Sequence, residues 1–118
     1  MNKEFIPYEQ AVELKELGFD ESFLGYYRNV DRSLFTNNKV VDPFYDTIAP
    51  LYQQAFRFFR EKYGIFGNVT YMQEFNYVFN IGNIPDCDYL SYGQDYNTYE
   101  EAELACLKKL IEIVKEKK

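Results

Sequence analysis

A short acidic stretch in the second half of the chain comes closest to a catalytic pattern. Asp86 and Asp88 are two residues apart, a spacing that can hold a divalent ion, and Asp95 follows as a candidate third ligand. A calcium loop needs further oxygen ligands at alternating positions and a glycine at a set place, and Gly93 does not fit that register. We therefore expect a solvated loop here, with no metal and no cofactor.

The absence of histidine from all 118 residues removes much of the chemistry of small enzymes. It excludes Ser-His and Cys-His nucleophiles, histidine-containing zinc sites and histidine pH switches. Cys87 lies between two carboxylates that disfavour its thiolate, and Cys106 lies in an apolar helical pattern that is expected to bury it. Two cysteines are also too few for the disulfide framework of a small secreted domain. We predict a protein that is not an enzyme and that works in the cytoplasm.

The charge of the chain argues against nucleic acid as the partner. There are 13 Lys and Arg against 19 Asp and Glu, a formal net charge of -6, and no basic residue lies between Lys62 and Lys108. Nucleic-acid-binding proteins usually carry a basic stripe that displaces counterions from phosphates. Nucleic-acid binding is therefore disfavoured and is kept only as an alternative to binding a protein. It would use a basic face formed by Arg57, Arg60 and Lys62.

The stretch between Lys62 and Lys108 is both acidic and rich in tyrosine towards its end. Tyrosine supplies a large contact area at low entropic cost, and interspersed carboxylates can steer a basic partner. The candidate partner-binding residues are Asp86, Asp88, Tyr89, Tyr92, Asp95, Tyr96, Tyr99 and Glu100. The alternative is a long solvated surface loop whose tyrosines are half-packed on a sheet.

Two helices are predicted in the first half of the chain. Apolar spacing and end signals place the first at residues 7–17, ahead of Gly18, which suits a left-handed cap. The second runs from Pro50 to Gly64 and has an aromatic inner face.

A third helix is predicted near the C-terminus, and its start has the strongest signal in the chain. The Thr98 hydroxyl can accept from the amide of Glu101, while the Glu101 carboxylate reaches back to the cap amide. The apolar stripe that follows is wide enough to pack on more than one side. We expect this helix to be central in the fold or to cover a sheet.

Between the helices the hydrophobic period changes to two. Over residues 69–81 the odd positions are nearly all apolar. Unbroken parity argues for one long strand or for a hairpin loop with an odd number of residues, and we favour one long strand, bent near Gln73. Residues 23–28 and 33–35 flank a turn-rich quartet and predict a hairpin, whereas residues 85–97 predict a loop.

These elements predict an α+β fold, with three helices packed on a small antiparallel sheet in the order α-β-β-α-β(-β)-α. The length allows one hydrophobic core, so we predict a single globular domain over residues 1–118. No window approaches the ~18 apolar residues that a membrane span requires, and the first ten residues lack the apolar core of a signal peptide.

Three segments carry a resemblance to known sequences: residues 7–20, 49–63 and 98–114, of which the last is the most specific. They resemble a family of small uncharacterised proteins from phages and prophage-like elements of Bacteroides and related gut bacteria. That family often has tryptophan after the Ala-Phe-Arg run, where this chain has Phe58. The resemblance implies a mobile-element origin and carries over no site.

The last helix is also similar to the final helix of the double-stranded RNA-binding module, whose lysines contact phosphates. In this chain the first turn carries Glu100, Glu101 and Glu103, which would repel phosphate. We therefore predict a small non-enzymatic phage-type protein that binds a host or phage protein, for example as an inhibitor of host defence. The alternatives are a nucleic-acid-associated accessory protein and a small metal-dependent enzyme that uses Asp86 and Asp88.

Overall fold

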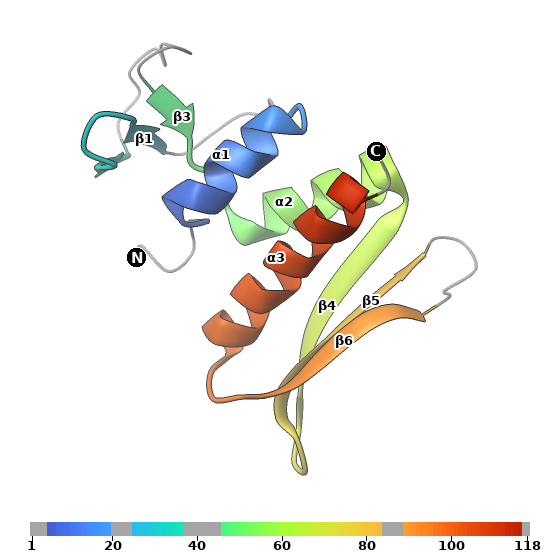
Figure 1. Ribbon diagram of the computed structural model, residues 1–118. Helices are drawn as coiled ribbons and strands as arrows, with labels where there is room; N and C mark the ends of the chain where they lie inside the picture. Colours follow the sequence, from blue (N-terminus) through green and yellow to red (C-terminus); the bar gives the residue numbers. More distant parts are fainter. Residues whose placement is uncertain (1–4, 20–24, 37–45, 84–88, 117–118) are drawn as a thin grey trace. The chain divides into compact units, whose positions relative to one another are not determined.

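The computed structural model describes residues 5–19, 25–36, 46–83 and 89–116, and its elements are labelled in Figure 1. These residues form three α-helices and two three-stranded antiparallel sheets, so the predicted α+β class is confirmed. The strands form two sheets where one was expected. The chain divides into two compact units, residues 1–55 and 56–118, and each is described by itself.

The first unit combines a helix with a sheet of three short strands. The elements are α1 (Tyr8–Glu16), β1 (Tyr26–Arg28), β2 (Leu34–Phe35) and β3 (Asp46–Ile48), with strand order β2-β1-β3. The first predicted helix is confirmed, since Pro7 caps it and the chain turns away at Gly18 with φ 97°. The predicted hairpin is confirmed in the pairing of β1 with β2, although residues 23–24 lie outside the described part. The sequence does not predict β3, because three residues are too few to show a period of two.

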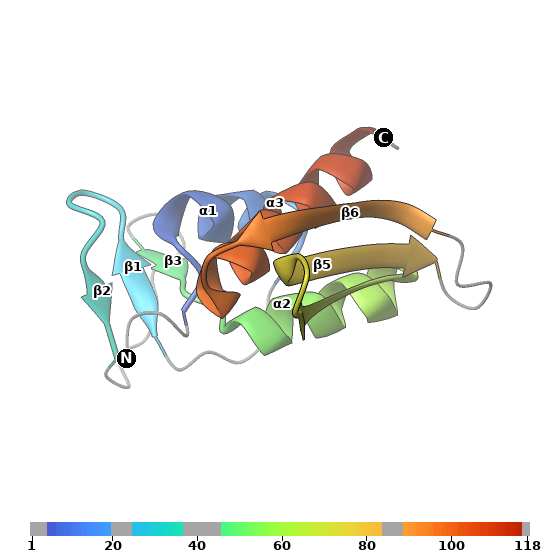
Figure 2. The same ribbon diagram turned by 90° about the horizontal axis from the view of Figure 1, so that it is seen from below.

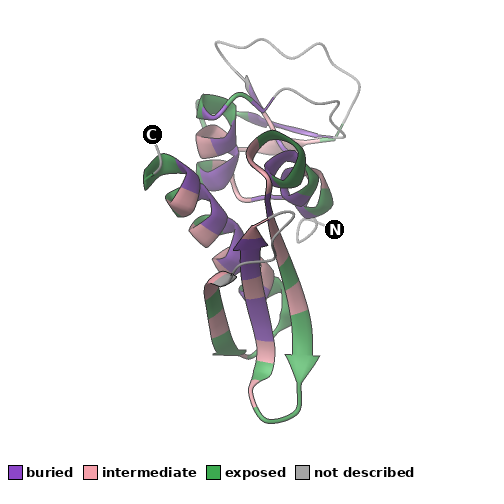
Figure 3. Ribbon diagram, turned by 90° about the vertical axis from the view of Figure 1, so that its right-hand side faces the viewer, coloured by how far each residue is buried: buried purple, intermediate pink, exposed green. Residues whose placement is uncertain are grey.

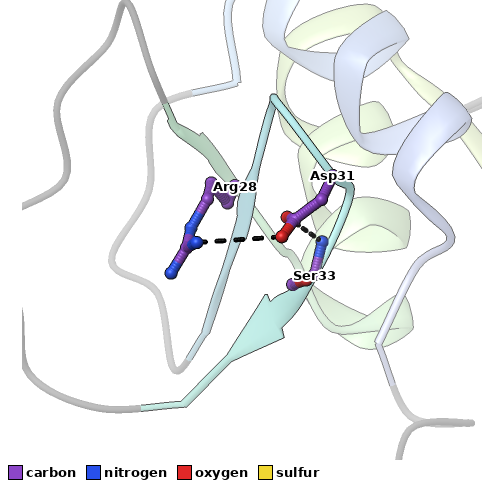
Figure 4. Close-up of polar contacts among 3 residues, drawn as sticks. All are labelled: Arg28, Asp31 and Ser33. Atoms are coloured by element: carbon purple, nitrogen blue, oxygen red, sulfur yellow. Dashed lines mark hydrogen bonds and ion pairs between the residues drawn. The ribbon is translucent and has the colours of Figure 1, made fainter.

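The turn between β1 and β2 is fixed by one carboxylate (Figure 4). Asp31 Oδ1 accepts a hydrogen bond from the backbone amide of Ser33 at 3.1 Å, and Asp31 Oδ2 lies 3.7 Å from Arg28 Nη1. Hydrogen bonds from Ser33, and then the charge of Arg28, hold the pKa of the Asp31 carboxyl below its ordinary value. A short polar side chain that bonds to the backbone two residues later stabilises such a turn.

The second predicted helix exists but changes its winding halfway. It begins as α2 (Tyr52–Phe58), continues as the π-helix η2 (Phe59–Tyr63) and ends at Gly64 with φ 66°. Phe59 is fully buried, and its ring packs against those of Phe58 and Tyr63 at centroid distances of 5.5 and 6.0 Å. Aromatic spacing predicts the helix and its end. The π-turn has no signal in the sequence that we can identify.

The segment predicted as one long strand is a hairpin, so that prediction is wrong. β4 (Ile65–Met72) pairs with β5 (Asn76–Asn83) in an unbroken antiparallel register, and the connecting loop has three residues, 73–75. A loop with an odd number of residues keeps the apolar residues at odd positions on both sides of the turn. Such a hairpin is the alternative that the sequence left open. Asn76 takes φ 58°, a left-handed conformation that asparagine tolerates and that lets the chain reverse in so short a loop.

The loop predicted over residues 85–97 is also wrong for most of its length. Residues 89–96 form β6 (Tyr89–Tyr96), which pairs with β5 and completes the sheet order β4-β5-β6. The register between β5 and β6 shifts at two places. These bulges break the period of two that would have marked the strand in the sequence. Residues 85–88 lie outside the described part.

The C-terminal helix α3 (Tyr99–Glu116) covers one face of this sheet, as Figure 2 shows with the helix behind the strands. Its predicted cap is present, because the amide of Glu101 donates to Thr98 Oγ1 at 3.1 Å. The Glu101 carboxylate accepts instead from the amide of Asn97, one residue before the expected position, at 3.3 Å. The hydrophobic core of the second unit lies between α3 and the central strand β5. This strand is largely buried, as Figure 3 shows.

The closest approach of α3 to the sheet occurs at Gly67 on β4. A Cβ atom there would lie 2.7 Å from Cys106 Sγ and 3.2 Å from Leu110 Cδ1. We expect Gly67→Ala to lower the free energy of unfolding by about 1–3 kcal/mol, because the added methyl group overpacks this contact. Urea unfolding followed by circular dichroism measures the change. The Gly67→Ala/Cys106→Ala double variant should recover part of the loss, and a strictly additive double variant would contradict the assigned contact.

Candidate functional site

The candidate partner-binding residues fall on β6, on the first turn of α3 and outside the described residues. Asp86 and Asp88 lie outside them, and for Tyr89 the structure describes only its place at the start of β6. The other five form a continuous stretch of the fold that we call the β6 surface: Tyr92, Asp95, Tyr96, Tyr99 and Glu100. The acidic, tyrosine-rich stretch is thus largely a strand and a helix start rather than a solvated loop.

The β6 surface presents tyrosines on both faces of the sheet. Tyr92 lies opposite Asn80, which in turn lies opposite Asn68, on the face that α3 does not cover. Tyr96 lies opposite Tyr77, in the row of side chains on the α3 side. Tyr92 is 55% exposed, and Tyr71 on the other edge strand is 62% exposed.

On the α3 side, aromatic packing fixes the orientation of the tyrosine rings. The Tyr99 ring stands edge-on to that of Tyr77 at a centroid distance of 6.2 Å, and the Tyr96 ring lies 6.0 Å from that of Phe79. A Cβ atom at Gly93 would lie 2.5 Å from Phe79 Cε2, so only glycine leaves room for this packing. Tyr99 nevertheless remains 43% exposed. Its ring is therefore packed against Tyr77 while the residue stays partly exposed to solvent.

Asp95 lies at one of the two bulges and ties β6 to the neighbouring hairpin. Its backbone is left-handed, with φ 70°, and its amide donates to the carbonyl oxygen of Phe75 at 2.8 Å. Its carboxylate is exposed. The bulge therefore directs a negative charge outward beside Tyr96, which is how bulges commonly reorient side chains at the edge of a sheet.

The neighbours on α3 that shift the pKa of Tyr99 are all acidic groups. Burial, followed by the charges of Glu103, Cys106 and Glu100, raises the pKa of the Tyr99 hydroxyl. Burial and then the nearby Glu100 raise the pKa of the Glu103 carboxyl to about 7. Glu103 shares a helical face with Tyr99, so the fold partly removes this carboxylate from water.

This raised pKa predicts a pH-dependent cost at Glu103. The folded pKa lies above the unfolded value, so the cost is absent below about pH 4, grows as pH rises and is complete above pH 7. The shift from 4.5 to about 7 corresponds to at most about 3 kcal/mol. Because the carboxyl keeps part of its hydration, we expect Glu103→Gln to stabilise the fold by about 1 kcal/mol at pH 8.

Urea unfolding at pH 4 and pH 8 measures this effect. Glu74→Gln, which removes an exposed carboxylate from the β4–β5 loop, is the matched control and should change neither value appreciably. A Glu103→Gln variant whose advantage is the same at both pH values would contradict the raised pKa.

Two kinds of chemistry can be tested on the described residues: a nucleophilic thiol and a metal site. Cys106 is fully buried, and burial, followed by the charge of Glu103, raises the pKa of its thiol to about 12. A thiol in this state is not a nucleophile near neutral pH. No group of three His, Cys, Asp or Glu among the described residues could hold a metal ion.

The alternative basic face lies on α2 and η2. Arg57 and Arg60 are both exposed and are one helical turn apart. The Lys62 ammonium lies 5.4 Å from the ring centre of Phe58 and 5.5 Å from that of Tyr63, so this lysine is engaged with the aromatic cluster. With Glu61 beside them, these side chains form a small positive patch rather than a stripe.

The sequence did not identify Tyr71 and Tyr77 as neighbours of the candidate site. The hairpin register places Tyr71 opposite Tyr77, and Tyr77 opposite Tyr96, so three tyrosines form one row across the sheet. The Tyr71 and Tyr77 rings meet edge-on at 5.3 Å. The signal that could have found this row is the run of apolar residues at odd positions from 69 to 81. It predicts the row when it is interpreted as a hairpin whose loop has an odd number of residues.

Comparison of the chain with protein-family models, curated proteins and solved structures gave no match. Among the described helices, none is both long enough and apolar enough to span a membrane.

Proposed function

We propose that this chain is a non-enzymatic binding protein that attaches to another protein through the β6 surface, in the cytoplasm of a bacterial host. The observation that supports the proposal is a pair of exposed tyrosines: Tyr92 on the edge strand β6 and Tyr99 at the start of α3, which follows that strand. Large aromatic side chains held in place and left partly open are typical anchors of protein interfaces.

The charges around these anchors indicate the chemistry of the partner. Asp95, Glu100 and Glu103 are negative, and no lysine or arginine occurs between Lys62 and Lys108. A partner segment rich in arginine or lysine would gain both steering by the carboxylates and cation–π contact with the tyrosine rings. We therefore propose a basic segment of a protein as the occupant. The resemblance to phage proteins indicates a bacterial host as the source in which to search.

The test is quantitative affinity purification from such a host with matched variants. The parent chain, Tyr99→Ser, Tyr92→Ser and Val30→Ser are immobilised, and the captured proteins are compared by mass spectrometry. Val30 is the control because it is 84% exposed in the turn between β1 and β2 and belongs to the first unit, whereas the β6 surface belongs to the second. We expect at least one protein whose capture falls about tenfold with a tyrosine variant and is unchanged with Val30→Ser.

Two further results would decide against the proposal. If every protein captured by the parent is captured equally by both tyrosine variants, the β6 surface does not bind it. If capture is lost instead with Arg57→Glu and nuclease treatment abolishes it, the basic face and a nucleic acid account for the function. Melting curves of each variant show that the fold is retained.

A further inference from the structure

The sheet of the second unit has one regular edge and one irregular edge. β4 pairs only with β5 among the described residues, over eight residues with no break in register. Alternate amide and carbonyl groups along β4 therefore point away from the sheet. At the opposite edge, β6 is interrupted by two register shifts, and Asp95 there is left-handed.

Natural proteins usually protect an edge strand against pairing with another chain. The usual devices are a charged side chain, a proline, a bulge or a very short strand. β6 uses bulges and Asp95, but β4 reads Ile-Phe-Gly-Asn-Val-Thr-Tyr-Met and contains no charge and no proline. The strand is also exposed over its last three residues, 70–72. By these criteria β4 is an unprotected edge.

We propose that β4 pairs antiparallel with β4 of a second copy of this chain, with Val69 on the two-fold axis. A two-fold axis perpendicular to the sheet pairs residues of the same face, so that Val69 meets Val69 and Gly67 meets Tyr71. The β4-β5-β6 sheets of the two copies then form one six-stranded sheet, and both α3 helices lie on the same face of it. This interface lies at the edge opposite the β6 surface, so it is independent of the proposed partner site.

The side chains at the two ends of β4 are complementary under this symmetry. Tyr71 is 62% exposed, and in the dimer it would lie opposite Gly67, whose own face is already covered by Cys106 and Leu110 of α3. The π-helix before β4 carries Arg60, Glu61 and Lys62, a net charge of +1, whereas Glu74 follows β4 in the hairpin loop. Antiparallel pairing places the basic start of one strand beside Glu74 of the other, twice in the dimer. Each end of the proposed interface thus brings together opposite net charges.

Light scattering coupled to gel filtration over a wide concentration range tests the assembly. The expected mass at high concentration is twice the 14.1 kDa of the chain. Thr70→Lys places an extra positive charge near the axis on both copies, and it should restore the single-chain mass. Gln94→Lys is the matched control, because it adds the same charge to an exposed position on β6 and should leave the dimer intact.

Cysteine cross-linking tests the register even if Thr70→Lys misfolds. In a Cys87→Ser background, Val69→Cys would place two thiols directly opposite each other, with Cα atoms about 4.5–5.5 Å apart. That separation suits a disulfide. Tyr71→Cys is more exposed, but its two Cα atoms would be about 14 Å apart, too far to be bridged.

We expect rapid oxidation of Val69→Cys to a covalent dimer and at least a tenfold slower reaction of Tyr71→Cys. The proposal is overturned if the parent keeps the single-chain mass at every concentration and Val69→Cys reacts no faster than Tyr71→Cys. It is also overturned if a folded Thr70→Lys remains dimeric, because the two copies would then meet elsewhere.

Discussion

Cys106→Asp should unfold most of the protein at neutral pH. Cys106 is fully buried where α3 crosses β4, and the raised thiol pKa of about 12 shows that this site disfavours a negative charge. An aspartate here must either ionise away from water beside Glu103 or bind a proton at neutral pH. We expect a loss of at least about 4 kcal/mol, which is a large part of the stability of a small domain.

The measurement is urea unfolding followed by circular dichroism, with two controls. Cys106→Ala should cost only about 1–2 kcal/mol, because it removes one buried atom and adds no charge. Lys108→Asp adds an aspartate to the exposed face of the same helix and should change the stability little. A Cys106→Asp variant as stable as Lys108→Asp would show that α3 does not carry the core.

The helix boundaries could be predicted because their signals are local. Gly18 and Gly64 both adopt positive φ at helix ends, where other residues would be strained. The Thr98 cap depends on residues that are three apart in the sequence. Such signals need no knowledge of the tertiary structure. The register of the sheet, by contrast, depends on contacts between distant segments.

The two errors in the second half have one physical origin. The hydrophobic period cannot distinguish a long strand from a hairpin with a three-residue loop, and β6 shows no period because its bulges shift successive side chains. Gly93 and Asp95 were interpreted as loop residues. In the structure Gly93 makes room for Phe79, and Asp95 occupies the bulge. Residues typical of loops can therefore belong to an edge strand.

In the candidate site, too, the sequence predicts the kinds of residue present but not how the fold arranges them. Tyrosines and acids in the stretch indicate a binding surface by their composition alone. Their distribution over the two faces follows from the bulges, which place Tyr92 opposite Asn80 and Tyr96 opposite Tyr77. Sequence reasoning treats these two tyrosines as equivalent. In the structure the Tyr96 ring packs on Phe79, whereas Tyr92 lies on the opposite face of the sheet and is 55% exposed.

Substitutions of tyrosines and of acids in the β6 surface should impair binding in different ways. Tyr99→Ala removes a desolvated anchor, so we expect a loss of ~1–4 kcal/mol, seen as dissociation that is roughly 5 to 1,000 times faster. Glu100→Lys reverses a charge at the rim, so it should mainly slow association with a basic partner and weaken its salt dependence. Surface-immobilised kinetics at two salt concentrations, with the partner identified by affinity purification, separate the two effects.

Asp95→Asn is the control variant that removes one negative charge and keeps the backbone conformation of the bulge. Asparagine tolerates the left-handed φ of 70° at this bulge, so the variant should keep the β6 geometry while it removes one carboxylate. Its association should therefore slow less than that of Glu100→Lys, and its dissociation should match the parent.

If Tyr99→Ala and Glu100→Lys both bind as the parent does, the β6 surface is not the interface. The basic face at Arg57 and Arg60 then becomes the better candidate, and the same kinetics with Arg60→Glu test it.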